Sequence, residues 1–265
     1  MPDTHPIHAK AGFISDMDGV IYHGNTLLPG ANEFIAWLTA AGKKYLFLTN
    51  SSERSPRELS EKLARMGLQV PADCFYTSAM ATASFLASQC PGGSCYVIGE
   101  PGLTNALYEA GFSMNDASPD YVVVGETRGY NYDRIRHAVQ LVRKGARLIG
   151  TNPDLTGPTE RGIVPATGSL IAPIELAGGR KAYFTGKPNP LMMRSALQKL
   201  GCRREETAII GDRMDTDILA GIEAGIDTIL VLSGVTAQAD LPRFAYRPDH
   251  VFATLGHIVS GLPAS

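Results

Sequence analysis

Short hydrophobic runs alternate along the chain with longer segments in which apolar residues recur every three or four positions. The short runs are typical of buried strands and the longer segments of amphipathic helices. We expect strands at residues 13–15, 44–48, 95–98, 121–124, 147–149, 182–185, 207–211, 228–232 and 250–252. We expect helices at residues 31–41, 56–67, 79–88, 133–144, 190–200 and 218–224, with one more before residue 121. This alternation predicts an α/β fold with a doubly wound, mostly parallel sheet, as in Rossmann-like domains.

Two segments carry signals of their own. Ser55 precedes Pro56, and Glu58 stands three residues after Ser55, so a capping box is predicted at this helix start. Residues 151–168 are rich in Gly, Pro and Thr and predict an unusually long loop. Loops of that length inside compact domains are usually functional.

Acidic side chains follow two of the predicted buried strands. Asp16 and Asp18 come after the first strand, and Asp212 and Asp217 come after the strand at 207–211. Ligands of open α/β sheets bind at the carboxyl ends of the strands. Two carboxylates about 4 Å apart repel by roughly 4 kcal/mol at an effective dielectric constant near 20, so a proton or a cation must offset them. The spacing does not fit a calcium loop, which needs Gly at its sixth position and Glu at its twelfth.

Two more strand ends carry polar side chains. Thr49 and Asn50 follow the second predicted strand, and Lys187 follows the strand at 182–185, where Pro188 favours an extended backbone. We expect all four strand ends to meet at one edge of a single sheet. Carboxylates, a hydroxyl and an ammonium group suit a phosphoryl group and Mg²⁺.

The spacing of these residues indicates their roles. Asp16 at the strand tip can attack phosphorus and form an aspartyl-phosphate. Asp18 can protonate the leaving oxygen and then deprotonate the attacking water. Lys187 and Thr49 would hold phosphoryl oxygens, although Thr49 could instead be a helix N-cap.

The second acidic group is expected to serve the metal. Asp212 would bind Mg²⁺ directly, and Asp217 would help to orient the ion without being a direct ligand. Asp217 could also be an ordinary acid at a helix start, a position that acids favour.

At these residues the chain resembles a known family. Four motifs occur in the order found in haloacid dehalogenase-like phosphatases: Asp16-Met17-Asp18-Gly19-Val20, Thr49-Asn50, Lys187 and Gly211-Asp212-x-x-x-Thr216-Asp217. Residues 76–83, 124–128 and 151–154 extend the resemblance to the NagD-type branch over nearly the whole chain. The resemblance implies a core domain at 1–78 and 183–265, and an inserted α/β cap of class II at 79–182.

The resemblance also implies a magnesium-dependent phosphomonoesterase and its site. Metal contacts would come from the Asp16 side chain, the Asp18 backbone carbonyl and Asp212, with Asp217 beside them. Residues expected to bind substrate phosphate or the leaving group are Gly19, Thr49, Asn50, Ser51, Lys187 and, in the cap, Asn152 and Asp154. The two cap residues could instead only shape a turn.

Several functions stay open. Nucleoside 5′-monophosphates are one expected substrate class, while nitrophenyl phosphate, phosphoglycolate, pyridoxal phosphate and sugar phosphates are alternatives. The long segment at 156–162 puts a direct transfer of nucleotide preference in question. A receiver-like module that accepts phosphate on Asp would need neither Asp18 nor a large insertion. A dehalogenase would need no magnesium, so the acidic group at Asp212 argues against that activity. A phosphomutase would return the phosphoryl group to a second hydroxyl, and the sequence excludes it less firmly.

Composition narrows the setting. The 265 residues are 44% hydrophobic with a formal net charge of −2, so nothing indicates a nucleic-acid partner. Residues 1–10 do not resemble a signal peptide, and no apolar run approaches the roughly 20 residues of a membrane span. The four cysteines form no Cys-x-x-Cys pair, which argues against zinc and favours a reducing cytoplasm. The expected partner is a small phosphate ester, and a homo-oligomer formed through the cap stays open.

Overall fold

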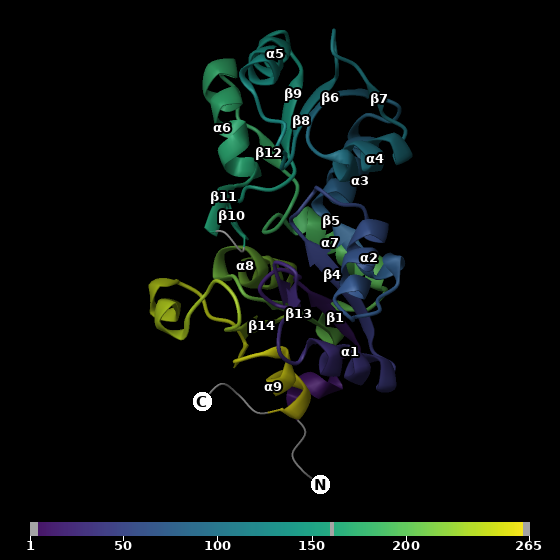
Figure 1. Cartoon of the computed structure of the whole chain (residues 1–265), viewed down its shortest axis with the longest axis vertical. Helices are drawn as coiled ribbons and strands as arrows, with labels where there is room; N and C mark the ends of the chain where they lie inside the picture. Colours follow the sequence, from purple (N-terminus) through teal and green to yellow (C-terminus); the bar gives the residue numbers. More distant parts are fainter. Residues whose placement is uncertain (1–4, 160–161, 262–265) are drawn as a thin grey trace. The chain divides into compact units, whose positions relative to one another are not determined.

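The computed structural model describes residues 5–159 and 162–261 (Figure 1). Its chain divides into two compact units. The first combines the residues up to Thr49, Ser60–Tyr76 and the residues from Met192 on. The second combines Asn50–Leu59 and Thr77–Leu191.

The first unit is built on a six-stranded sheet in the order β15-β14-β13-β1-β4-β5. Strand β1 pairs in parallel with both β13 and β4, and β14 pairs in parallel with β13 and β15. Every residue of β1 and β13 is buried, which explains why these hydrophobic runs take the two central positions. The strands are β1 (Gly12–Ser15), β4 (Lys44–Thr49), β5 (Phe75–Thr77), β13 (Thr207–Gly211), β14 (Asp227–Val231) and β15 (His250–Phe252).

Helices surround this sheet, and a small hairpin follows β1. The helices that belong wholly or largely to this unit are α1 (Ala31–Ala40), α2 (Pro56–Arg65), α7 (Pro190–Leu200), α8 (Leu219–Ala224) and α9 (Leu255–Ser260). A π-helical turn, Met214–Ile218, leads into α8. Short 3-10 turns cover Pro6–Ala9, Ala72–Cys74, Arg204–Glu206 and Gln238–Arg243. The hairpin consists of β2 (Tyr22–His23) and β3 (Thr26–Leu27), which pair antiparallel.

The second unit has a five-stranded parallel sheet in the order β12-β9-β8-β6-β7. Its strands are β6 (Ser94–Ile98), β7 (Ser113–Met114), β8 (Tyr121–Val124), β9 (Arg147–Gly150) and β12 (Tyr183–Phe184). Helices α3 (Ser78–Gln89) and α4 (Pro101–Glu109) cover one face, and α5 (Tyr132–Arg143) and α6 (Thr167–Gly178) cover the other (Figure 1). Val123 packs in one hydrophobic cluster and Val122 and Val124 in the other, so the sheet is buried on both faces.

Most expected elements are present with boundaries shifted by one or two residues. The predicted capping box is also confirmed, because the backbone N–H of Ser55 donates to Glu58 Oε2 at 2.8 Å. In return, the N–H of Glu58 donates to Ser55 Oγ at 3.4 Å.

Two expectations were wrong. The segment 151–168 is not one long loop, because β10 (Thr156–Thr159) and β11 (Gly162–Pro165) form an antiparallel hairpin before α6. Glu160 and Arg161 of this segment lie outside the described residues. The strand that leads to Lys187 does not join the sheet of Asp16, because Tyr183 pairs with Ile149 of β9 in the other sheet.

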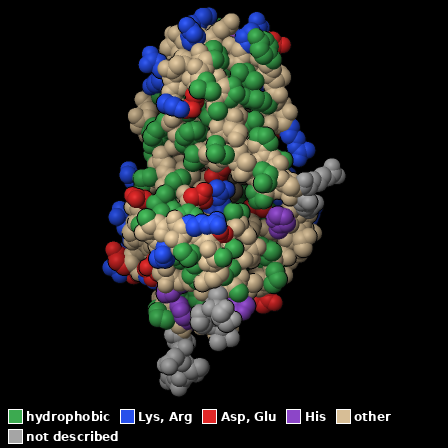
Figure 2. Space-filling view, turned by 90° about the vertical axis from the view of Figure 1, so that its left-hand side faces the viewer, with side chains coloured by type: hydrophobic (Ala, Val, Ile, Leu, Met, Phe, Trp, Pro, Cys, Tyr) green, Lys and Arg blue, Asp and Glu red, His purple; other side chains and the backbone are tan. Residues whose placement is uncertain are grey.

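The predicted division into a core at 1–78 and 183–265 and a cap at 79–182 stays a prediction. Residues 50–59, 77–78 and 183–191, which that division gives to the core, group with the second unit by their contacts. Within the described residues, no helix is long and apolar enough to cross a membrane, and all four cysteines are free. Figure 2 shows hydrophobic side chains scattered among charged side chains, other side chains and backbone on the face that it presents. In the second unit, Leu176 is 82% exposed and Tyr132 is 77% exposed.

Candidate active site

Three carboxylates of the first unit converge beyond the ends of two neighbouring strands. Ser15 of β1 lies opposite Ile210 of β13, and the N–H of Asp16 donates to the carbonyl of Ile210 at 2.8 Å. The chain therefore leaves both strands side by side. One carboxylate oxygen from each of Asp16, Asp212 and Asp217 lies within 4.8 Å of the others. Like charges this close repel, and a hard divalent cation with oxygen ligands would offset that repulsion.

The backbone packs closely around Asp212, which is only 1% exposed. The N–H of Val235 donates to Asp212 Oδ2 at 2.7 Å, and the N–H of Thr236 donates to the Asp212 carbonyl at 3.0 Å. A Cβ atom added at Gly19 or Gly234 would overlap Asp212 Oδ2. Gly19 also has a φ of +77°, which disfavours other residues. These two glycines therefore allow the chain to hold the Asp212 carboxylate in place.

Asp217 is fully buried and lies in the π-helical turn before α8. The N–H of Arg213 donates to Asp217 Oδ2 at 3.2 Å, and a Cβ atom at Gly211 would overlap the Asp217 side chain. The expected helix start at Ile218 is thus preceded by a turn that aims Asp217 back toward the strand end. Asp215 of the same turn is exposed and pairs with Arg213 at 2.9 Å, so it does not belong to the cluster.

A sharp turn begins at Asp18, two residues after Asp16. The N–H of Gly19 donates to the carbonyl of Tyr22 at 2.8 Å, and Asp18 forms an isolated bridge with Tyr22. Ser233 Oγ donates to the Gly19 carbonyl at 2.8 Å and holds the turn from outside.

Thr49 is the last residue of β4, the other neighbour of β1, and is 7% exposed. Thr49 and the acidic residues therefore lie at the carboxyl edge of one sheet, as expected.

The other predicted site residues belong to the second unit, where Asn50 joins two segments. Its Nδ2 donates to Asp154 Oδ2 at 2.9 Å and to the Lys187 carbonyl at 3.0 Å. Its Oδ1 accepts a hydrogen bond from the Lys187 N–H at 2.8 Å. Lys187 is 2% exposed and precedes Pro188 through a cis peptide bond, while Ser51 is half-buried. Asn50, Asp154 and Lys187 are therefore brought together although they are distant in sequence.

Glu126 is a residue to which sequence reasoning gave no role. Its Oε2 accepts hydrogen bonds from the Ser52 hydroxyl at 2.6 Å and the Ser52 N–H at 3.1 Å. Its Oε1 accepts one from Asn152 Nδ2 at 2.6 Å, and the same amide nitrogen donates to the Asn50 carbonyl at 2.7 Å. Glu126 thus fixes the segment that carries Asn50 and Ser51. Its position just after the buried strand β8 was a usable signal.

The haloacid dehalogenase-like hydrolase family matches residues 13–113, and a HAD-hydrolase-like family matches residues 184–258. Dihydroxyacetone phosphatase from Corynebacterium glutamicum is 48% identical over 246 residues, which are 93% of this chain and 90% of that protein. Ribonucleotide monophosphatase NagD from Escherichia coli is 46% identical over 245 residues, which are 92% of this chain and 96% of that protein.

Solved structures agree with these relationships. The structure of NagD from Escherichia coli matches with a TM-score of 0.88 and covers 94% of this chain and 98% of its own. The magnesium complex of glycerol phosphate phosphatase from Mycobacterium tuberculosis is 29% identical and matches with a TM-score of 0.89 over 95% of this chain and 77% of its own. The chain belongs to the haloacid dehalogenase-like hydrolases and, within them, to the NagD-type phosphatases of small phosphate esters.

Proposed function

We propose that this phosphatase depends on Mg²⁺ and forms an aspartyl-phosphate at Asp16. The observation that carries the proposal is the cluster of Asp16, Asp212 and Asp217, whose carboxylate oxygens lie within 4.8 Å of one another. Their oxygen-only chemistry fits a hard divalent cation. When bound, the ion would neutralise charge on the phosphoryl group so that it can approach a carboxylate. The magnesium complex of the Mycobacterium tuberculosis relative supports the same choice of ion.

The reaction would proceed in two steps at one phosphorus atom. An Asp16 carboxylate oxygen attacks phosphorus while the bond to the ester oxygen breaks, and Asp18 gives its proton to that leaving oxygen. Asp18 then takes a proton from a water molecule, which attacks phosphorus and breaks the bond to Asp16. Inorganic phosphate leaves, and both carboxyl groups return to their starting states. The turn through Gly19 and Tyr22 supports this assignment, because it fixes the backbone at Asp18, only two residues after Asp16.

The remaining site residues would hold the ion and the phosphoryl oxygens. Asp212 and the Asp18 carbonyl would bind the ion, and Asp217 would orient it. Phosphoryl oxygens would be bound by Gly19, Thr49, Asn50, Ser51 and Lys187. A buried ammonium such as that of Lys187 supplies a full positive charge that is little screened by water.

Substrate choice would be made in the second unit, where residues 79–182 form the proposed cap. Asn152 and Asp154 would meet the leaving group, and the bond from Asn50 to Asp154 supports a link between phosphate binding and substrate choice. The named relatives act on a ribonucleotide monophosphate and on dihydroxyacetone phosphate, so both classes are candidates here. We place the enzyme in the cytoplasm, without nucleic-acid or membrane partners. A homo-oligomer through the cap stays a prediction.

Phosphate release from a panel of monoesters tests this proposal. The panel contains a nucleoside 5′-monophosphate, dihydroxyacetone phosphate, nitrophenyl phosphate, phosphoglycolate and pyridoxal phosphate, each assayed with Mg²⁺ and with excess chelator. Wild type and the Asp215→Asn control should need Mg²⁺, whereas Asp212→Asn should lose about a hundredfold or more in kcat/KM. Full turnover in chelator, or equal losses in both variants, would contradict the metal assignment. Circular dichroism checks that each variant is folded.

A further inference from the structure

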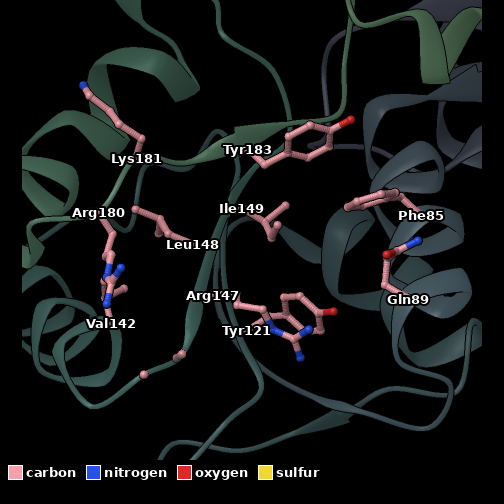
Figure 3. Close-up of a pocket in the computed structure, with 12 residues that line it drawn as sticks. Phe85, Gln89, Tyr121, Val142, Arg147, Leu148, Ile149, Arg180, Lys181 and Tyr183 are labelled. Atoms are coloured by element: carbon pink, nitrogen blue, oxygen red, sulfur yellow. The ribbon is translucent and has the colours of Figure 1, made fainter.

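The second unit contains a pocket of about 530 Å³ that is lined by none of the predicted phosphatase residues. Tyr121, Arg147 and Tyr183, each at the start of its strand, contribute to it, and Phe85 and Gln89 of α3 form one side (Figure 3). This volume lies in the usual range for small-molecule sites. The pocket is therefore large enough to hold an organic ligand.

The charged residues that line this pocket are all cations. They are Arg147, Arg180 and Lys181, and no Asp or Glu is among the lining residues. Lys181 pairs with Glu175 at 3.1 Å, but 86% of the Lys181 side chain is exposed, so that pair is weak. Within the described residues, Arg180 forms no ion pair. The pocket therefore favours an anion.

Arg147 is held at the pocket by a ring rather than by a strong ion pair. Its guanidinium lies 3.9 Å from the centroid of the Tyr121 ring, and its Nη2 lies 3.9 Å from Asp120 Oδ1, at the limit for a salt bridge. The other oxygen of Asp120 accepts hydrogen bonds from the N–H and hydroxyl of Ser94 at 2.9 Å each. Arg147 Nε also donates to the Asp120 carbonyl at 3.4 Å, which leaves most of the Nη donors available for a ligand. Arg suits bidentate binding of phosphate.

Aromatic and polar side chains complete the pocket. The rings of Phe85 and Tyr183 lie 5.0 Å apart between centroids at 32°, and Tyr183 is 45% exposed. Figure 3 shows Gln89 on the same side as Phe85, and Lys181 and Arg180 on the opposite side. The buried Tyr121 hydroxyl has no hydrogen-bond partner among the described residues. These features suit a flat ring that carries hydrogen-bonding groups.

We propose that this pocket binds an organic phosphate with an aromatic ring, of about the size of a mononucleotide. Its phosphate contacts Arg147, Arg180 and Lys181. Its ring stacks on the pair formed by Phe85 and Tyr183. The Gln89 amide can bond to the edge of the ring. The proposal does not depend on the catalytic assignment, because none of these residues takes part in the proposed reaction.

Isothermal titration calorimetry with adenosine 5′-diphosphate tests this proposal on the whole chain in chelator. Without a cation, the acidic cluster repels a nucleotide, so binding there is disfavoured. Pyrophosphate provides the charge without the ring, and adenosine provides the ring without the charge. We expect one molecule of adenosine 5′-diphosphate to bind per chain, about tenfold or more tightly than either pyrophosphate or adenosine. No binding of the nucleotide, or equally tight binding of pyrophosphate, would overturn the proposal.

Matched variants locate the bound nucleotide. Arg180→Gln changes an exposed side chain and should leave folding unchanged, yet it should weaken binding severalfold; Arg147→Gln and Phe85→Leu should each weaken it by about tenfold. Arg143→Gln, an exposed change outside the pocket, should have no effect. Binding that resists all three pocket substitutions but is lost in Lys187→Ala would place the nucleotide at the phosphatase site instead and overturn the proposal.

Discussion

Asn152 donates a hydrogen bond to Glu126 at 2.6 Å, and this contact links two segments that are 26 residues apart in the chain. Through the same amide, Asn152 reaches the carbonyl of Asn50 at 2.7 Å, while Glu126 also holds Ser52. The loop that follows β4 is thus fixed from both sides. A carboxylate that accepts three hydrogen bonds leaves three donors unpaired when it is removed, and each unpaired buried donor costs about 1–3 kcal/mol.

We therefore expect Glu126→Ala to lower both stability and activity. The variant should unfold at a lower temperature, and its KM should rise several-fold because Asn50 and Ser51 lose their support. Glu126→Gln keeps the shape and one acceptor, so it should recover part of both losses. Thermal unfolding and steady-state kinetics measure this. An Ala variant with wild-type KM would show that Glu126 does not position the loop.

Gly234→Ala should disturb Asp212 directly. The added Cβ atom would overlap Asp212 Oδ2, so the carboxylate must move or the segment around Val235 must shift. We expect about a tenfold or larger loss in kcat/KM and a higher Mg²⁺ concentration for half-maximal activity. Gly256→Ala is the matched control in the same unit, since its Cβ atom would have only ordinary contacts of 3.6 Å. Equal behaviour of the two variants would contradict the role of Gly234.

Magnesium should stabilise the folded protein. An ion that binds only the native state adds about 2.7 kcal/mol at a concentration of 100 times its dissociation constant. Differential scanning calorimetry should show a transition temperature that rises with Mg²⁺ in wild type and in Asp215→Asn. In Asp212→Asn this rise should be much smaller. An unchanged rise would mean that Mg²⁺ binds somewhere other than the acidic cluster.

Glu58 should contribute stability that depends on pH. The backbone N–H of Ser55, and then its hydroxyl, hold the pKa of the Glu58 carboxyl below its usual range. A lowered folded pKa stabilises the protein above the unfolded pKa near ~4.3, and this contribution is lost as pH falls through the folded value. Glu58→Gln should therefore cost about 0.5–1 kcal/mol at pH 7, and this difference from wild type should shrink as the pH falls below the lowered pKa of the folded protein. Urea unfolding across this pH range measures this, and a constant difference would contradict it.

The central strands and acidic residues could be predicted because strong local patterns specify them. The run before Asp16 and the run before Asp212 are wholly buried, so both had to be central strands. Parallel pairing then placed their ends together without any knowledge of the 195 residues between Asp16 and Asp212. The capping box at Ser55 was similarly local, since its two partners are three residues apart.

Other features had no sequence signal strong enough to find them. A two-residue strand such as Tyr183–Phe184 does not specify which sheet it joins, and only its pairing with Ile149 decides this. The hairpin at 156–165 contains Pro158 and two glycines, a composition that is more typical of loops than of strands. The donors that hold Asp212 are backbone N–H groups, which no side-chain motif reveals.

The most direct test of the account asks where the phosphoryl group is carried during turnover. Asp18→Asn should slow hydrolysis of the intermediate more than its formation, so acid quenching after substrate addition should trap it. Mass spectrometry should then find one phosphoryl group on the peptide that contains Asp16, and none when Asp16→Asn is added to the same variant. Phosphoryl on a different residue, or phosphate release by Asp16→Asn at the wild-type rate, would contradict the account.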